Sequence, residues 1–250
     1  MSQELRRKIE ARRRIYLVRH GEVSYFDATG RPHPHRSVPL NEDGRKQALE
    51  ARDALARVPI DRAVCTGLPR TQETAQIILS GRDLRPETLT ALQEVSPGPF
   101  AKESLGSAFE AFFTNAFAGS ASRESQFLGG ESFGAFQDRV IPAFQALLAD
   151  PAWKHLLLVA HGGTNRLLLL YALGADLTAL GALEQDAGCI NVIDVHEENR
   201  LVIRQMNLSP RRALELSPWT TTLEKIYLDH YEQAARAIES GAANGPRRTS

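Results

Sequence analysis

Three short apolar runs in this chain end abruptly in polar residues, and this pattern limits the folds open to it. The first covers residues 15–18 and is followed directly by Arg19 and His20. The other two cover residues 63–65 and 156–160. Apolar runs of this length without alternation are typical of strands buried on both faces of a parallel sheet. We therefore expect buried parallel strands with polar residues at their carboxyl ends.

Segments with helical apolar spacing lie between and after these runs, so strands and helices should alternate. The predicted helices cover residues 41–57, 68–79, 133–148 and 164–173, and two further strands are predicted at 189–195 and 201–205. Asn41 is suited to cap the first of these helices. The alternation predicts an α/β protein, a three-layer α/β/α sandwich with a largely parallel central sheet.

The length of the chain, 250 residues, suits one domain of this class, which we place at residues 1–240. Within it, residues 96–130 lack clean periodicity apart from a predicted helix at 108–117, and we interpret this segment as a cap or lid. Residues 223–240 predict a C-terminal amphipathic helix. Residues 241–250 are rich in Gly, Ala, Arg and Ser and predict a disordered tail.

Charge and composition argue against several classes of partner. Thirty basic residues balance thirty acidic ones, so no overall charge favours nucleic acid or an anionic membrane. The apolar runs are too short to span a bilayer, and the basic N-terminal segment lacks the apolar stretch of a signal peptide. Cys65 and Cys189 have neither disulfide-scaffold nor metal spacing. We expect a cytoplasmic protein, and a homodimer is left open.

The polar residues at the predicted strand ends suit a phosphoryl group. Arg19 and His20 follow one strand, His161 follows another, and Arg70 stands in the first turn of a helix, where the helix N-terminus favours an anion. Guanidinium groups match phosphate oxygens, and a phosphoryl group carries a charge of about −1.5 to −2 near neutral pH. A histidine with a reference pKa of about 6.5 is available as a neutral nucleophile near pH 7.

These motifs resemble the histidine phosphatase superfamily, also called phosphoglycerate mutase-like. Its strand-plus-RHG motif matches residues 17–22, its arginine-helix motif matches residues 66–75, and its second-histidine motif matches residues 161–163. Thr66 stands where the family usually has serine. The matches lie in the family's order over roughly residues 15–205, and they imply its fold.

The resemblance also implies roles for the matched residues. His20 is expected to form a phosphohistidine, while Arg19, Arg70 and His161 hold the phosphate. A cationic His161 would also stabilise charge in the transition state. We expect neither a cofactor nor a metal ion, because two guanidinium groups and one imidazolium can neutralise the phosphate.

The departing alkoxide needs a proton, so a carboxylic acid should lie near the scissile oxygen. In phosphatases of this family the donor follows an L-x-E pattern, which Leu92-Gln93-Glu94 matches. We therefore assign Glu94 as the acid, and as the base that later activates water. Glu22 is the other candidate, and we interpret it as a loop-positioning or substrate-side residue.

The surroundings of the motifs differ from those of phosphoglycerate mutases. Residues 23–27, 32–35 and 95–100 replace the W-N, glycine-containing and glycine–tryptophan–glutamate segments of the mutases. We therefore predict a metal-independent phosphomonoester hydrolase that acts on a small phosphorylated metabolite. The alternatives are phosphoglycerate mutase-type phosphoryl transfer and non-catalytic binding of a phosphorylated ligand.

Three other features have simpler interpretations. His33 and His35 lack the further ligands of a metal site and predict a solvated loop, with a wall of the substrate pocket as the alternative. The arginines at 12–14 predict a solvated segment before the first strand. Four phenylalanines within 109–117 have helical spacing and predict an apolar face, which would favour apolar parts of a substrate if it covers the pocket.

Overall fold

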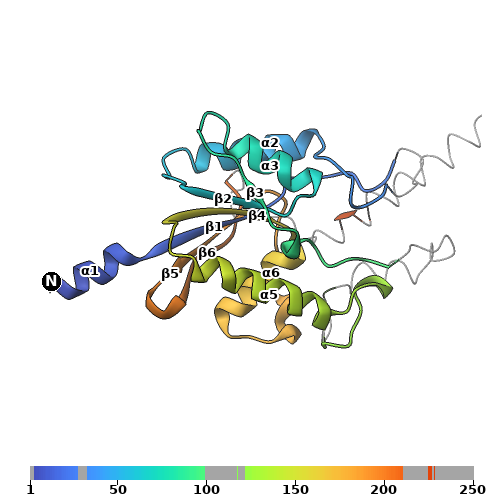
Figure 1. Cartoon of the computed structure of the whole chain (residues 1–250). Helices are drawn as coiled ribbons and strands as arrows, with labels where there is room; N and C mark the ends of the chain where they lie inside the picture. Colours follow the sequence, from blue (N-terminus) through green and yellow to red (C-terminus); the bar gives the residue numbers. More distant parts are fainter. Residues whose placement is uncertain are drawn as a thin grey trace, which may run out of the picture.

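The computed structural model describes residues 3–27, 33–98, 117, 122–210, 225, 226 and 228. Helices and strands alternate through most of the chain, as the apolar pattern predicts (Figure 1). In chain order, the main elements are α1 (Gln3–Ala11), β1 (Arg13–Arg19), α2 (Glu42–Ala54), β2 (Arg62–Cys65), α3 (Pro69–Ile78), β3 (Glu87–Thr88), α5 (Phe133–Ala149), β4 (His155–Ala160), α6 (Gly162–Leu173), β5 (Ile190–Val195) and β6 (Leu201–Leu208).

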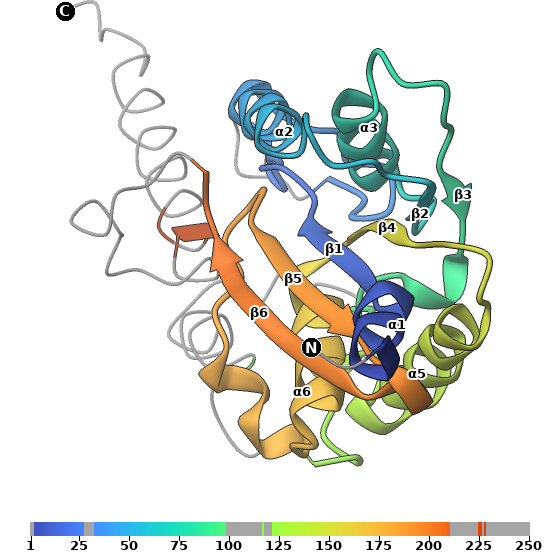
Figure 2. The same ribbon diagram turned by 90° about the vertical axis from the view of Figure 1, so that its left-hand side faces the viewer.

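The strands form one six-stranded mixed sheet in the order β3-β2-β4-β1-β5-β6. The first four in this order run parallel, while β5 and β6 are antiparallel to their neighbours. Helices α2 and α3 cover one face of the sheet, and α5 and α6 cover the other (Figure 1). Figure 2 shows β3 and β6 at opposite edges. The predicted three-layer sandwich with a largely parallel sheet is confirmed.

Strand β1 lies at the centre of the core, which explains its continuous apolar run. Ile15 and Leu17 pack in the cluster that includes side chains of α5 and α6, whereas Tyr16 and Val18 pack in the cluster with α2 and α3. Successive side chains of a strand point to opposite faces, so a central strand covered on both sides favours apolar side chains at every covered position. The polar residues Arg19 and His20 therefore lie at the carboxyl end of β1 and just after it.

The arginines before the first strand correct one prediction. Arg13 and Arg14 are not a solvated segment but the first residues of β1. The Arg13 guanidinium donates to the carbonyl oxygens of Leu148 and Asp150, both at 2.6 Å. Arg14 forms a two-point ion pair with Asp194 on β5, at 2.5 and 3.0 Å. The arginine side chains are long, so these residues can belong to the sheet while their guanidinium groups reach Asp194 on β5 and the carbonyl groups at the end of α5.

Several predicted segments fall wholly or largely outside the described residues. They are the helix at 108–117, apart from Phe117, the middle of the proposed cap at 96–130, and the tail at 241–250. Of the predicted helix at 223–240, only residues 225, 226 and 228 are described. The division into one domain, a cap and a tail stays a prediction.

None of the described helices combines the length and the apolar character needed to cross a bilayer. Cys65 and Cys189 are both buried and free. Burial raises the pKa of the Cys189 thiol to about 12, so this side chain behaves as a small apolar group.

The first turn of α2 lies against the loop that follows β1. Asn41 caps this helix, as predicted, by accepting the N–H of Gly44 at 2.8 Å, and the N–H of Asn41 donates to the carbonyl oxygen of Glu22 at 3.0 Å. A Cβ atom on Gly44 would overlap the backbone of Glu22. The absence of a side chain at position 44 is therefore what allows the helix and the loop to approach so closely.

We expect Gly44→Ala to lower the free energy of unfolding by about 2 kcal/mol, because the new methyl group forces the loop and helix apart. In an unobstructed helix the same change stabilises by about 0.5–1 kcal/mol. The sign of the effect therefore tests the contact. Urea denaturation measures it, and a more stable variant would contradict the proposed packing.

Candidate active site

The parallel pairing of β1 and β4 brings the two histidines of the predicted site together. Arg19 is in register with Ala160, and the N–H of His20 donates to the Ala160 carbonyl oxygen at 3.0 Å. His20 and His161 are the residues that directly follow these two strands, at the carboxyl ends of β1 and β4. Their ring centroids lie 5.2 Å apart in an edge-to-face arrangement, and both side chains are buried.

The hydrogen bonds of His20 indicate its tautomer. Nδ1 lies 2.7 Å from the carbonyl oxygen of Gly21, which can only accept, so Nδ1 carries the proton. Nε2 accepts from Nε of Arg70 at 3.3 Å. His20 is therefore a neutral imidazole whose lone pair is on Nε2, the nitrogen that faces the Arg70 guanidinium.

The two predicted arginines reach this site from different elements. Arg70, in the first turn of α3, is only 2% exposed, and its Nη1 donates to the carbonyl oxygen of His35 at 2.7 Å. Arg19, the last residue of β1, donates from Nη1 to the carbonyl oxygen of Gln185 at 2.5 Å. Both guanidinium groups line one pocket. The structure therefore brings Arg19, His20, Arg70 and His161 into one cluster.

A chain of hydroxyl groups holds the ring of His161. Its Nε2 lies 2.8 Å from Oγ1 of Thr66, which lies 3.0 Å from Oγ1 of Thr71, and Thr71 donates to the Leu68 carbonyl oxygen at 2.8 Å. Since the carbonyl can only accept, each hydroxyl proton points along the chain toward it, and Nε2 of His161 is the donor to Thr66. The neutral ring therefore has its lone pair on Nδ1. This buried atom has no hydrogen-bond partner among the described residues.

Burial and positive charge keep both imidazoles neutral. Desolvation lowers the pKa of His20 well below its usual value, and Arg70 and Arg19 lower it further. Desolvation is also the largest cause for His161, whose pKa is likewise lowered well below the usual range, with smaller contributions from Arg70, His20, Arg19 and Arg139. A buried cluster of cations and neutral imidazoles is an environment that favours an anion.

Glu94 lies beside this cluster, at the N-terminus of α6. Its Oε2 accepts the N–H of Gly163 at 2.9 Å, and its Oε1 accepts the N–H groups of Thr164 at 3.2 Å and Val95 at 3.0 Å. A Cβ atom on Gly163 would overlap Oε1 of Glu94. The glycine of the second-histidine motif therefore leaves the space that the carboxylate occupies. Helix α6 thus positions both His161, which precedes it, and Glu94, which contacts its first turn.

Glu22 has different partners. Its carboxylate accepts from Nδ2 of Asn41 at 3.2 Å and forms an ion pair with Lys225 at 2.5 Å. The Glu22 N–H donates to Oε1 of Gln47 at 2.8 Å. All three contacts tie the loop after His20 to neighbouring segments. They fit the interpretation of Glu22 as a loop-positioning residue.

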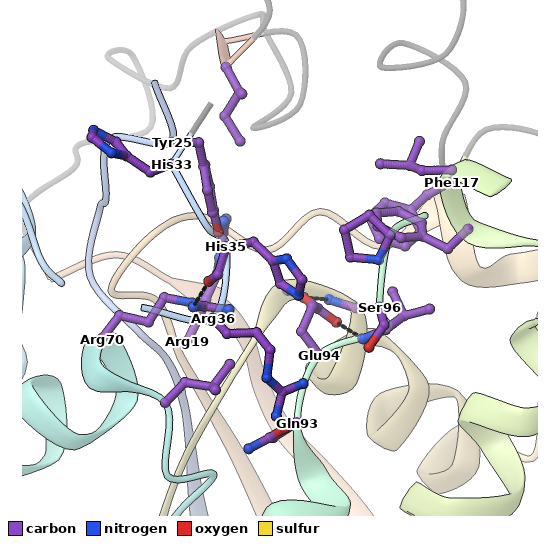
Figure 3. A pocket seen from close by; sticks show the side chains of 18 of the residues that line it. Arg19, Tyr25, His33, His35, Arg36, Arg70, Gln93, Glu94, Ser96 and Phe117 are labelled. Carbon is purple, nitrogen blue, oxygen red and sulfur yellow. Dashed lines mark hydrogen bonds between the residues drawn. The ribbon is translucent and has the colours of Figure 1, made fainter. Parts of the chain in front are cut away.

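The pocket above the cluster has an aromatic and apolar wall. Figure 3 shows Arg70 on one side of the pocket, Phe117 on the opposite side and Glu94 between them. Phe117 stacks on Phe127 with ring centroids 5.2 Å apart, and Leu128 and Tyr25 also line the pocket. Phe117 is the described member of the phenylalanine segment that was predicted to favour apolar parts of a substrate.

The histidine-containing loop contributes to the same pocket. His33, His35 and Arg36 are among its lining residues, and Arg36 donates to Oε1 of Gln93 at 2.8 Å across it. The loop is solvated, as predicted, because His33 and Arg36 are exposed. Its alternative, a wall of the pocket, also agrees with the structure. Among the residues that the structure describes, no group of three or more His, Cys, Asp or Glu side chains is arranged to hold a metal ion.

Sequence reasoning missed Arg166, a buried arginine in the pocket wall. It forms an ion pair with Glu184 at 3.1 Å, and its guanidinium lies 4.8 Å from the centre of the Phe117 ring. The available signal was a single arginine before the leucine run of α6, one helical turn after Gly162. Arg166 thus connects the pocket floor with its aromatic wall.

Comparison with known proteins agrees with this geometry. The family model of the histidine phosphatase superfamily (branch 1) matches residues 15–208. An adenosylcobalamin/alpha-ribazole phosphatase of Salmonella typhimurium is 31% identical over 191 residues, which are 74% of this chain and 91% of that protein. A probable phosphoglycerate mutase GpmB of Salmonella paratyphi A is 30% identical over 75% of this chain and 87% of that protein.

A solved structure shows the same relationship. The crystal structure of a putative alpha-ribazole-5'-P phosphatase from Escherichia coli aligns with a TM-score of 0.65 and 27% identity, over 79% of this chain and 97% of that one. The family match runs from Ile15 in β1 to Leu208 at the end of β6, so it includes every strand of the sheet. The chain belongs to the histidine phosphatase superfamily.

Proposed function

We propose that this protein is a metal-independent phosphomonoester hydrolase that forms a phosphohistidine on His20. The observation that supports this most directly is the neutral His20 ring, whose Nε2 lone pair faces Arg70 in a cluster with Arg19 and His161. Several relatives are named as phosphatases, which also supports phosphate-ester hydrolysis as the reaction. The substrate would be a small phosphorylated metabolite.

The hydrogen bonds of His20 support attack by its Nε2 on phosphorus. The N–H groups of Arg70 that now contact His20 and the His35 carbonyl would turn to the phosphate oxygens, which are better acceptors because they are charged. Nδ1 of His20 would keep its bond to Gly21 and delocalise the positive charge that develops on the ring as the N–P bond forms.

His161 would take up a proton when the phosphate binds. Its unprotonated Nδ1 lies in a site whose cations oppose protonation until a dianion enters. The bound dianion reverses this balance, because a nearby negative charge favours the imidazolium. Nδ1–H would then donate to a phosphate oxygen and stabilise the transition state.

Glu94 would take up a proton from solvent when the substrate binds, give it to the leaving alkoxide, and then act as a carboxylate base for water. Oε1 accepts two N–H groups and Oε2 accepts one, so Oε2 retains a lone pair that can hold the transferred proton. After the alcohol leaves, the same oxygen would deprotonate a water that attacks the phosphohistidine. The carboxylate changes roles while its backbone anchors keep it in place.

The pocket wall supports a substrate with an apolar or aromatic portion. Tyr25, Phe117, Phe127 and Leu128 provide flat and apolar surface beyond the phosphate site. Alpha-ribazole phosphate, named for several relatives, is therefore a suitable compound to test first. Phosphoglycerate mutase-type transfer is the second candidate, because relatives of about 30% identity carry that name. This wall fits a small, highly charged phosphoglycerate less well.

Replacing the nucleophile tests the proposal. We expect wild-type protein to hydrolyse p-nitrophenyl phosphate in the presence of a chelator, and His20→Ala to lose all detectable activity. Rapid acid-free quenching of the wild-type protein with labelled substrate should trap phosphate on His20.

A mutase would instead convert 3-phosphoglycerate to 2-phosphoglycerate, and we expect no such conversion with or without bisphosphoglycerate. Hydrolysis that survives His20→Ala, or that disappears with the chelator, would refute the mechanism. Tight phosphate binding without turnover on any substrate would indicate a non-catalytic binding protein.

Replacing the acid should affect substrates according to their leaving groups. Glu94→Gln should lower kcat/KM for an alkyl phosphate such as glycerol phosphate by about 100-fold, because general acid catalysis is worth about 10²–10⁴-fold. The loss for p-nitrophenyl phosphate should be less than about 10-fold, since nitrophenolate leaves without a proton. Glu22→Gln is the matched control, and a selective loss in that variant instead would transfer the acid role to Glu22.

The buried neutral histidines should make stability depend on pH. Their pKa values are lowered in the folded state, so below about pH 6.5 the unfolded chain binds more protons than the folded one. The free energy of unfolding should then fall as the pH is lowered from about 7 to 5, by at most about 1.4 kcal/mol per pH unit for each histidine. A His20→Asn/His161→Asn variant should show a shallower fall by urea denaturation in phosphate-free buffer. Equal slopes would show that the two rings are not held neutral.

A further inference from the structure

Arg139, in the middle of α5, holds the backbone that carries Glu94. Its Nη1 donates to the carbonyl oxygens of Ala91 at 2.9 Å and Gln93 at 2.7 Å, and its Nη2 donates to that of Glu94 at 2.9 Å. The three carbonyl groups belong to the short segment that leads from the sheet to the pocket. Arg139 therefore binds the backbone of two of the three residues of the L-x-E motif, Gln93 and Glu94, and that of Ala91 just before it.

The remaining N–H groups of Arg139 bind Glu131. Nε donates to Oε1 at 2.7 Å and Nη2 donates to Oε2 at 2.8 Å, which is the two-point geometry that arginine alone provides. Together with the three carbonyl contacts, all five N–H groups of the guanidinium are used. The ring of Phe136 lies 5.0 Å below it and fixes its plane.

Glu131 also binds the backbone that follows Glu94. Its Oε2 accepts the N–H of Ser96 at 3.0 Å, and its own N–H donates to the Ser96 carbonyl oxygen at 2.8 Å. Burial opposes ionisation of Glu131, but the bonds from Arg139 and Ser96 outweigh it and lower its pKa. Arg139 and Glu131 therefore bind the backbone on both sides of the proposed acid.

The side chain of Glu94 is held from the opposite direction by the first turn of α6. Its carboxylate meets the N–H groups of Gly163 and Thr164, while its backbone carbonyl meets Arg139. General acid catalysis requires the acid to lie within hydrogen-bonding reach of the leaving oxygen, so a shift of about 1 Å can cost about 100-fold in rate. Loss of the Arg139 bond to the backbone, or of the α6 bonds to the carboxylate, would allow Glu94 to shift by such a distance.

We propose that Arg139 and Glu131 are positioning residues for proton transfer by Glu94, acting through the backbone of residues 91–96. This inference rests on the proposed function, because it assigns Glu94 the role of the acid. It differs from a general structural role in one measurable respect. A misplaced acid slows only the substrates that need one, whereas a loosened fold slows all substrates alike.

The test compares leaving groups in conservative variants. Arg139→Lys keeps the charge but cannot make the two-point pair, and Glu131→Gln keeps the shape but loses the charge. We expect each to lower kcat/KM for glycerol phosphate by about 10–100-fold and for p-nitrophenyl phosphate by less than about 3-fold. Adding Arg139→Lys to Glu94→Gln should then cost little more on glycerol phosphate, because the acid it positions is already absent.

Arg62→Lys is the matched control. Arg62 also makes a two-point pair, with Glu87 at 3.1 and 3.0 Å, and a third bond to Asp150 at 2.5 Å, but it lies at the start of β2, the end opposite the site. We expect it to change both substrates by the same small factor.

The outcomes distinguish failure of the positioning role from failure of the proposed function. A selective loss in Glu94→Gln with an equal loss, or none, on both substrates in Arg139→Lys and Glu131→Gln would overturn the positioning role and leave the proposed function intact. Activity that survives His20→Ala would overturn the proposed function itself. If Arg139→Lys does not fold, as judged by circular dichroism, Glu131→Gln decides alone.

Discussion

The parallel pairing of β1 with β4 is the interaction on which the site depends. The register that aligns Arg19 with Ala160 also makes His20 and His161 neighbours, because both residues follow their strands by one position. Each strand is covered by helices on both faces, so its polar residues appear only where the sheet ends. A slip of two residues along either strand would preserve the packing of the core and separate the two imidazoles.

Charge is concentrated locally in a protein whose overall charge is balanced. Arg19 and Arg70 come from different elements and converge on two buried imidazoles, which they help to keep neutral. Desolvation is the larger cause, so the state of the histidines depends on the packed sheet and helices more than on any single neighbour. The same environment that keeps His20 neutral favours an entering dianion, so the proposed mechanism uses one cluster for both binding and phosphoryl transfer.

The proposed acid is supported by a separate part of the structure. The residues proposed to bind phosphate lie at strand ends and helix N-termini, whereas Glu94 lies on irregular chain outside any helix or strand. Helix α6 anchors its carboxylate, and Arg139 and Glu131 anchor its backbone from α5. The aromatic wall begins beyond this segment, with Phe117 against Arg166. In the proposed mechanism, phosphate binding, proton transfer and substrate shape therefore depend on different elements around one pocket.

The amino-acid pattern was enough to predict β1, β2, β4, β5 and β6, helices α2, α3, α5 and α6, and the four residues proposed to bind phosphate. Uninterrupted apolar runs identify central strands. Because the carboxyl ends of parallel strands lie at the same end of the sheet, the sequence alone predicts that Arg19, His20 and His161 lie close together. The remaining contacts became evident only in the folded chain. Arg13 and Arg14 belong to β1, the loop of His33 and His35 lines the pocket, and Arg139 holds Glu94 from 45 residues away. These outcomes depend on which long side chain reaches which backbone carbonyl or pocket, and neither apolar periodicity nor local spacing contains that information.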